Sequence, residues 1–288
     1  MLAIKHILFP LDFSDRGCAA GPFVEAMASR FGAKVTLISV AQPIWYTGVG
    51  DPGTPLLLNT EEILNELKGR LGGAFAREFA HLRVERFAEF GDPAQTILDF
   101  AHKNAVDLIM MPTHGYGPFR SLLLGSVTAK VLHDASCPVW TTAHMEEAPS
   151  QDHIKPRSIL CAVDETPKSI ALMKWANELG KALGSGLRLV HAVPGMEGWP
   201  SQQMDRQFEE DLRQQARQQI TKMQAAAGVE AALCVAVGNI ADAVREEARR
   251  HNADLIVIGR GVMHEKLGRL RTHAYGIIRQ APCPVLSV

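Results

Sequence analysis

The chain contains the same ordered pattern twice, and this repeat constrains its fold more than any other feature. The matching pairs are "HILFPLDFSD" (6–15) with "SILCAVDETP" (158–167), "GDPAQTILDFAHKNAVDLIMM" (91–111) with "GNIADAVREEARRHNADLIVI" (238–258), and "ASCPV" (135–139) with "APCPV" (281–285). The second pair aligns without a gap, and six of its 21 positions are identical. The pairs follow one another in the same order, so the chain is a tandem duplication of one domain.

The repeat predicts two domains, residues 1–145 and residues 155–288. The join lies in "AHMEEAPSQDHIKP" (143–156), which is polar and holds two prolines, as linkers often do. Each copy is therefore about 140 residues long, a typical size for a single domain.

Composition excludes several classes of protein. The formal net charge is −1, so no global field draws the chain to nucleic acid or to an anionic membrane surface. No apolar run approaches the roughly 20 residues of a membrane-spanning helix, and the first residues make a poor signal peptide. The five cysteines are scattered, without zinc-site spacing. We expect a cytoplasmic protein with reduced, buried cysteines and no metal site made of protein ligands.

Strands and helices alternate along the first copy. The expected strands are 4–9, 34–40, 83–90, 106–111 and 137–142, and the expected helices are 15–31, 59–82, 93–104 and one from about 126. Asp15 is the expected N-cap of the first helix, and Asn59 with Glu62 fits a capping box for the second. In the second copy, apolar residues at spacings of three and four predict an amphipathic helix at 202–223 that packs on its own sheet.

This alternation predicts an α/β fold in which each copy is a doubly wound, five-stranded parallel α/β sandwich of Rossmann-like type. Such sheets bind ligands beyond the C-terminal ends of their strands, where the strand order reverses. Asp12, Val40 and the loop at 112–125 all follow expected strand ends. We therefore expect them to meet on one rim of the sheet.

The stretch "PTHGYGPFRSLLLGSV" (112–127) has the composition of a phosphate-binding loop. Glycine allows a close backbone approach, and Gly125-Ser126 opens a helix whose free N–H groups favour an anion. The hydroxyl of Ser126 adds a donor, His114 and Arg120 add donor or positive character, and the carboxylate of Asp12 can accept hydrogen bonds from ribose hydroxyls.

Other interpretations of this loop stay open or are disfavoured. Strand-to-helix connections use glycine freely, and Asp12 alone suits a turn or a helix cap. A Walker-type NTPase is disfavoured because no GK[ST] follows the glycines, and a Rossmann dehydrogenase because the glycines follow the fourth strand rather than the first. No Ser-His-Asp or Cys-His set can be picked out by spacing, so the sequence indicates no positioned catalytic base.

Taken in order, these motifs resemble the universal stress protein family in its tandem two-domain form. The resemblance rests on "FPLDFSD", "GDPAQTI", "DLIMMPTHGYG", "LLLGSV" and "ASCPV" in the first half. The family's nucleotide motif is G-2x-G-9x-G-S/T, and here Gly115 is followed by nine residues and then by Gly125-Ser126. The first motif glycine is replaced by Pro112, which removes one backbone N–H donor.

The resemblance implies a nucleotide-binding, hydrolase-like fold and a set of ligand contacts. By position, the contacts to base, ribose and phosphates would come from Pro10, Asp12, Val40, Met111, Pro112, Gly115, Gly125, Ser126 and Val127. The second half keeps Gly259 but has Arg271-Thr272 or Thr272-His273 in place of Gly-Ser, which predicts a copy with a degenerate motif. There, Arg260, Arg269 and Arg271 would meet an anion or form a solvated or interface surface.

The resulting expectation is a stress-response regulator that binds ATP through its N-terminal domain, with Mg²⁺ or Mn²⁺ carried on the phosphates. The family also implies that strands 137–142 and 283–288 pair within one chain as a pseudo-dimer with pseudo-two-fold symmetry, and that whole chains dimerise again. The alternatives are an interaction module that binds no nucleotide, with Pro112 as the disabling change, and a slow ATPase.

Overall fold

The structure, a computed structural model, describes residues 2–42, 60–113, 124–142, 154–194, 202–260 and 270–288. The expected cap Asn59, the loop residues His114, Gly115 and Arg120, and Arg269 lie outside the described residues.

Ten strands form one continuous sheet. They are β1 (His6–Pro10), β2 (Lys34–Ala41), β3 (Val84–Phe90), β4 (Leu108–Pro112), β5 (Val139–Thr142), β6 (Ser158–Ala162), β7 (Gly186–Val193), β8 (Ala232–Val237), β9 (Leu255–Ile258) and β10 (Val285–Ser287), in the order β3-β2-β1-β4-β5-β10-β9-β6-β7-β8. All neighbours within each copy are parallel, which confirms the predicted five-stranded parallel sheets.

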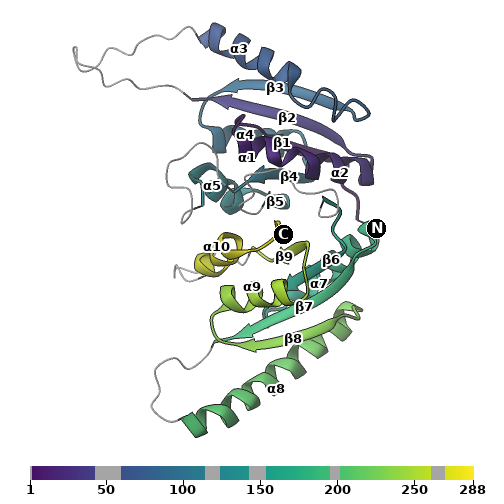
Figure 1. Cartoon of the computed structure of the whole chain (residues 1–288), viewed down its shortest axis with the longest axis vertical. Coiled ribbons are helices and arrows are strands. Elements are labelled where there is room, and N and C mark those ends of the chain that lie inside the picture. Colours follow the sequence, from purple (N-terminus) through teal and green to yellow (C-terminus); the bar gives the residue numbers. More distant parts are fainter. Residues whose placement is uncertain (1, 43–59, 114–123, 143–153, 195–201, 261–269) are drawn as a thin grey trace, which may run out of the picture.

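The two half-sheets join at their last strands. β10 runs antiparallel to β5, with Leu286 opposite Trp140, so the predicted pairing of the last strands within the chain is confirmed. The strand order therefore reads the same from either end. The two copies lie one above the other along the long axis of the molecule (Figure 1).

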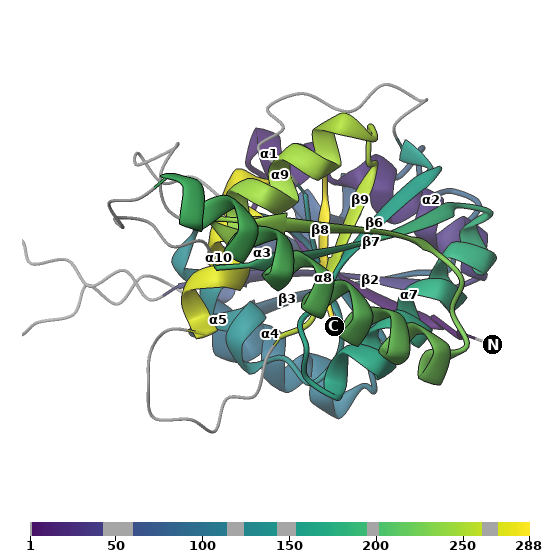
Figure 2. The ribbon, with the colours of Figure 1, turned by 90° about the horizontal axis from the view of Figure 1, so that it is seen from below.

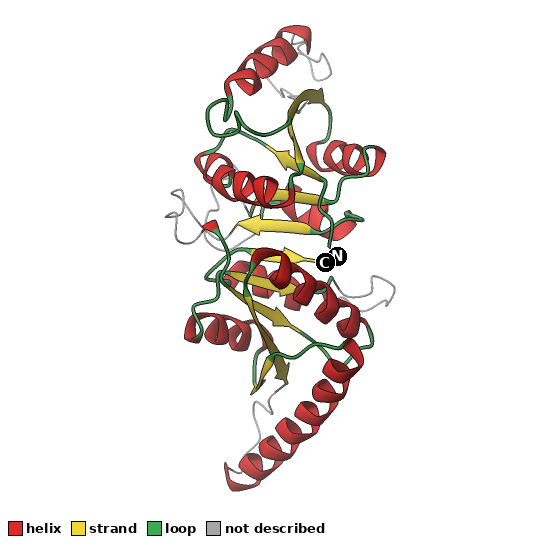
Figure 3. Ribbon diagram, turned by 90° about the vertical axis from the view of Figure 1, so that its right-hand side faces the viewer, coloured by secondary structure: helices red, strands yellow, loops and turns green. Residues whose placement is uncertain are grey.

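Helices cover both faces of this sheet (Figure 3). They are α1 (Asp15–Ala19), α2 (Gly21–Phe31), α3 (Thr60–Gly73), α4 (Pro93–Lys103), α5 (Ser126–Asp134), α7 (Lys168–Leu183), α8 (Gln202–Ala227), α9 (Ile240–Arg250) and α10 (Leu270–Gln280). One buried cluster includes side chains of α2, α3, α7 and α8, and the other includes side chains of α4, α5, α9 and α10. Each cluster contains residues of both copies, so the core does not stop at the join.

Side-chain hydrogen bonds also cross the join. The guanidinium of Arg260 donates to the carbonyl oxygens of Ala135 at 2.5 Å and Cys137 at 2.8 Å, and the hydroxyl of Tyr275 donates to the carbonyl of Ala129 at 2.9 Å. Of the two roles considered for Arg260, the structure therefore assigns it the interface.

The first expected helix, 15–31, is wrong in two respects. It is divided into α1 and α2 at Ala20, because Pro22 has no N–H to donate and its ring crowds the preceding turn. Its cap is Ser14 rather than Asp15: the Ser14 hydroxyl oxygen accepts the Gly17 N–H at 3.0 Å, and Asp15 begins the helix.

The second expected helix is too long. Its apolar pattern runs to Leu82, but α3 ends at Gly73 and a chain of turns follows. Phe75 has a φ of 52°, which no helix allows, and its ring stacks on Phe79 with centroids 4.9 Å apart. The apolar residues beyond Gly73 thus still pack on the core, but as a folded loop.

The long helix α8 packs on its own sheet as predicted, through its C-terminal half. Ala216, Ile220 and Met223 are buried, whereas Phe208, earlier on the same apolar stripe, is 45% exposed. Figure 2, seen from below, shows α8 nearest the viewer, crossing the second half-sheet.

Candidate functional site

The strand order of the first copy reverses between β1 and β4, and most of the predicted residues lie at this point. β1 pairs with β2 on one side and with β4 on the other. Leu8 lies opposite Ile109, so Pro10 and Met111, two residues further along each strand, occupy matching positions. Pro10 also lies opposite Ile38, so Asp12, two residues beyond the end of β1, comes level with Val40 of β2. This is the edge at which doubly wound sheets bind ligands.

Asp12 is exposed and stands in a hydrogen-bonded turn. Its Oδ1 accepts the backbone N–H of Ser14 at 3.0 Å and the hydroxyl of Ser14 at 2.6 Å. Within the described part of the chain, its Oδ2 has no hydrogen-bond partner. One carboxylate oxygen therefore builds the turn, and the other remains able to accept from a ligand.

The second copy contains the same turn. Oδ1 of Asp164 accepts the N–H of Thr166 at 3.0 Å, its hydroxyl at 2.6 Å, and the hydroxyl of Ser169 at 2.6 Å. The turn is thus a property of the fold, whether or not a copy keeps the glycine motif. A sequence signal for it existed, because both copies place Ser or Thr two residues after Asp.

The loop after β4 is closed at its base by two hydrogen bonds. The N–H of Gly125 donates to the carbonyl of Thr113 at 3.0 Å, and the hydroxyl of Thr128 donates to the carbonyl of Pro112 at 3.0 Å. These bonds hold the start of α5 against the end of β4. Thr113 and Thr128 were not among the residues that the sequence singled out.

Pro112 belongs to the strand, not to the loop as expected. It is the buried last residue of β4 and lies opposite Thr142. Its fixed φ suits an extended strand, and its carbonyl is used by Thr128.

Gly125 occupies the N-cap position of α5, with φ −57° and ψ 141°. Any residue adopts these angles, so positive φ does not explain the glycine. Gly125 has no side chain that could cap the helix, so within the described residues the N–H groups of the first turn have no capping side chain. Ser126 is exposed at this turn, and Val127 is half-buried beneath it.

Val40 is half-buried near the end of β2, opposite Glu89 of β3. His114, Gly115 and Arg120 fall outside the described residues. The structure thus brings Pro10, Asp12, Val40, Met111 and the start of α5 to one edge of the sheet.

The second copy differs at this edge. Gly259 follows β9, and the next residue, Arg260, points its guanidinium into the join between the copies. A Cβ at Gly259 would lie 3.4 Å from the side chain of Leu172, at van der Waals contact. The described residues of this copy therefore do not reproduce the arrangement around Thr113 and Gly125.

Two features are missing from the described residues. None of the described helices is both long enough and apolar enough to cross a membrane. Among the same residues, no three His, Cys, Asp or Glu side chains gather as metal ligands would.

Comparisons with known proteins agree with this architecture. The model of the universal stress protein family matches residues 3–142 and 156–288. A universal stress protein of Methanocaldococcus jannaschii is 32% identical over 138 residues, which is 47% of this chain and 79% of that protein. One from Thermus aquaticus is 33% identical over 138 residues, 47% of this chain and 96% of that protein.

Among solved structures, a universal stress protein from Archaeoglobus fulgidus superposes with a TM-score of 0.68 at 20% identity, covering 99% of this chain and 96% of that one. At that identity the likeness concerns the fold. The two family matches, one in each half, carry the assignment: this chain belongs to the universal stress protein family, with the family's sequence pattern present twice.

Proposed function

We propose that the protein binds ATP at the C-terminal edge of its first half-sheet and acts as a nucleotide-responsive stress regulator. The observation that carries the proposal is the start of α5. Its uncapped first turn is tied by the Gly125 N–H to the strand end at Thr113, beside the turn of Asp12. A helix start beside a carboxylate at a switch point suits the phosphates and the ribose of one nucleotide.

Each side chain has a role in this proposal. Oδ2 of Asp12 accepts from the ribose hydroxyls, and the apolar side chains of Pro10, Val40 and Met111 surround the base and sugar. The N–H groups of Ser126 and Val127 and the Ser126 hydroxyl donate to the phosphates.

The glycine at 125 keeps the space for this approach, because a side chain there would project from the helix end toward the phosphates. Gly115, His114 and Arg120 would complete the loop, and Pro112 would border the ribose. A divalent cation, Mg²⁺ or Mn²⁺, would be held through the phosphates and water, as such ions commonly are.

The second copy has a different role in the proposal. Its domain, residues 155–288, forms a non-binding partner that completes the sheet and the core, while residues 1–145 carry the nucleotide. Arg260 supports this division, because its guanidinium already bonds the carbonyls of Ala135 and Cys137.

The test is to identify what the purified protein holds. Acid should release adenine nucleotide from the wild-type chain, and protein stripped of nucleotide should take up ATP again. Gly125→Trp should release and take up none, because the indole would fill the phosphate position. If the stripped wild-type protein does not take up ATP, the better hypothesis is an interaction module that binds no nucleotide.

A further inference from the structure

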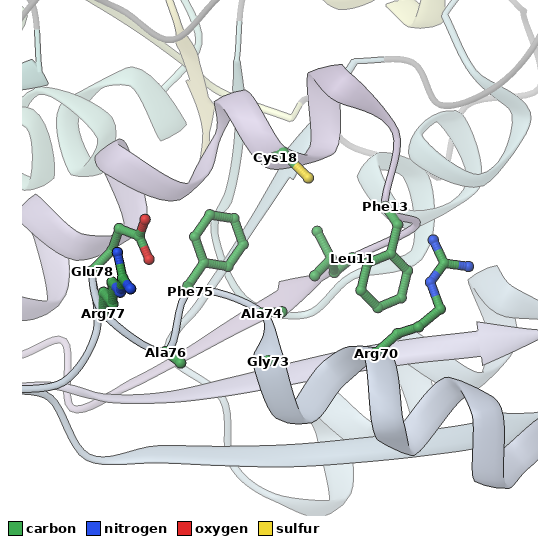
Figure 4. A pocket seen from close by; sticks show the side chains of 10 residues that line it. All are labelled: Leu11, Phe13, Cys18, Arg70, Gly73, Ala74, Phe75, Ala76, Arg77 and Glu78. Atoms are coloured by element: carbon green, nitrogen blue, oxygen red, sulfur yellow. The ribbon is translucent and has the colours of Figure 1, made fainter.

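A hollow of about 580 Å³ lies beside the Asp12 turn, on the side of the sheet that carries α1 and α3. Its walls come from the end of β1, from α1, from the end of α3 and from the loop that follows α3 (Figure 4). The lining side chains that matter here are Leu11, Phe13, Cys18, Arg70, Phe75 and Arg77. A volume of this size suits a small molecule.

Most of the lining residues are apolar. Figure 4 shows the rings of Phe13 and Phe75 on either side of Leu11, with the Cys18 thiol above them. Aromatic side chains pack favourably against another ring or an apolar group.

Arg70 is a cation of the hollow with no ion-pair partner among the described residues. The guanidinium of Arg70 lies over the ring of Phe13, 4.1 Å from its centroid, and forms no ion pair with a described side chain. Arg77, on the far side of Phe75, is followed by Glu78, whose carboxylate also lines the hollow and offsets the charge of Arg77. A planar guanidinium held flat on an aromatic ring keeps its N–H edge available for a carboxylate.

The two rings are held in an unfavourable backbone conformation. Phe13 has a φ of 60° and Phe75 a φ of 52°, and these are two of the four non-glycine residues with positive φ in the described chain. Such angles are rare for bulky residues and tend to mark functional positions. Gly21 permits the arrangement, because a Cβ there would come within 2.2 Å of the Phe75 ring.

The second copy lacks this arrangement in its described residues. The positions that match Phe13 and Cys18 are Glu165 and Ile170, and α8 runs unbroken where the first copy has the loop after α3. The fold therefore does not require the hollow, just as it does not require the Gly-Ser start.

From these observations we infer that the hollow is a binding site for a small amphipathic carboxylate, aromatic or branched aliphatic. The hydrocarbon part packs between Phe13 and Phe75, and the carboxylate pairs with Arg70 at the mouth. None of the residues that line the hollow belongs to α5, so its occupation is tested without a bound nucleotide.

The test uses 1-naphthoate and its uncharged analogue 1-naphthalenemethanol, titrated by calorimetry into the full chain without nucleotide. The wild type should bind the carboxylate at least about tenfold more tightly than the alcohol, since a charged hydrogen-bonded pair commonly has an effect of this size. Arg70→Gln should remove that preference and leave weak binding of the alcohol unchanged.

Arg83→Gln, an exposed arginine outside the hollow, is the matched control and should bind 1-naphthoate as the wild type does. Cys18→Trp, which fills the hollow, should abolish binding of both compounds. Thermal unfolding of each variant checks that it is folded.

Protection of the Cys18 thiol from a maleimide gives a second readout, because Cys18 is the exposed cysteine and the other four are buried or half-buried. 1-Naphthoate should slow its labelling. The inference is overturned if the wild type shows neither heat nor protection at millimolar 1-naphthoate, if the alcohol binds as well as the carboxylate, or if Arg83→Gln weakens binding as much as Arg70→Gln.

Discussion

The carboxylates of Asp12 and Asp164 stand in the same turn, and only one of them stands beside a Gly-Ser helix start. At the residue scale the sequence indicated both aspartates and offered a turn as one role for them, and the structure shows that both carboxylates accept from the Ser or Thr two residues on. The sequence also placed the cap of the first helix one residue late, because Ser14 and Asp15 are both good caps and only the fold decides between them. The hollow had no sequence signal, since its rings come from Phe13 and Phe75, 62 residues apart in the chain.

Asp12→Asn should separate the two roles of the carboxylate, which are the turn with Ser14 and the proposed contact with the ribose. An asparagine carbonyl can still accept from Ser14, so the unfolding midpoint should change little. The charge that would meet the ribose is lost, and we expect ATP affinity to fall about tenfold. Calorimetric titration with ATP measures this, and Asp164→Asn is the control. Equal loss in both variants would contradict the role given to Asp12.

The Cys18 thiol should ionise at higher pH than a free cysteine. Burial raises the pKa of Cys18, the carboxylates of Asp12 and Asp15 raise it further, and Arg70 lowers it. A raised pKa leaves less thiolate at a given pH, so the rate of alkylation should rise with pH later than that of N-acetylcysteine. Asp12→Asn should shift the rate profile to lower pH, and Arg70→Gln to higher pH. Shifts of the opposite sign would show that these charges do not face the thiol.

At the scale of elements, periodicity predicted every strand of the first copy and most of its helices, with ends displaced by about two residues, as is usual for boundaries. The prediction from periodicity was wrong at the C-terminal end of α3. The apolar spacing continues to Leu82, but Gly72 and Gly73 weaken the helix, and Phe75 gains contact with Phe9 and Phe79 by leaving it. The spacing of apolar residues in one sequence does not show whether a residue is more stable in a helix or in a tertiary contact outside it.

Two glycine-to-alanine changes test this packing. Gly21→Ala should lower the free energy of unfolding by about 1–3 kcal/mol, because its Cβ would lie 2.2 Å from the Phe75 ring. Gly69→Ala, within α3 with nothing within 4 Å of the added Cβ, should instead raise it by about 0.5–1 kcal/mol. Denaturant unfolding measures both. Equal effects of one sign would mean that Phe75 does not pack against Gly21.

At the scale of the whole molecule, the repeat predicted two half-sheets, and their antiparallel junction followed from the family resemblance. What no repeat could show is how the second copy uses its altered motif. Arg260 stands where the first copy has Thr113, and burial lowers its pKa while it bonds two carbonyls across the join. At this position the second copy has a side chain that joins the two copies.

Arg260→Met should weaken the join. Removing hydrogen bonds from a charged donor to two carbonyls should cost about 1.5–3 kcal/mol of unfolding free energy, whereas Arg249→Met, at an exposed position, should change it by less than about 0.5 kcal/mol.

Because both buried clusters span the two copies, the wild type should unfold in a single transition. Two separate wild-type transitions would contradict this coupling.

The most direct test of the central claim is the stoichiometry of ATP binding by calorimetry on the stripped 288-residue chain. One site per chain is predicted. The site should be lost in Gly125→Trp and kept in His273→Trp. The control variant His273→Trp places a tryptophan in the first turn of α10, at the exposed position of the second copy that matches Val127. No binding, two sites per chain, or an unchanged site in Gly125→Trp would contradict a nucleotide site at the start of α5.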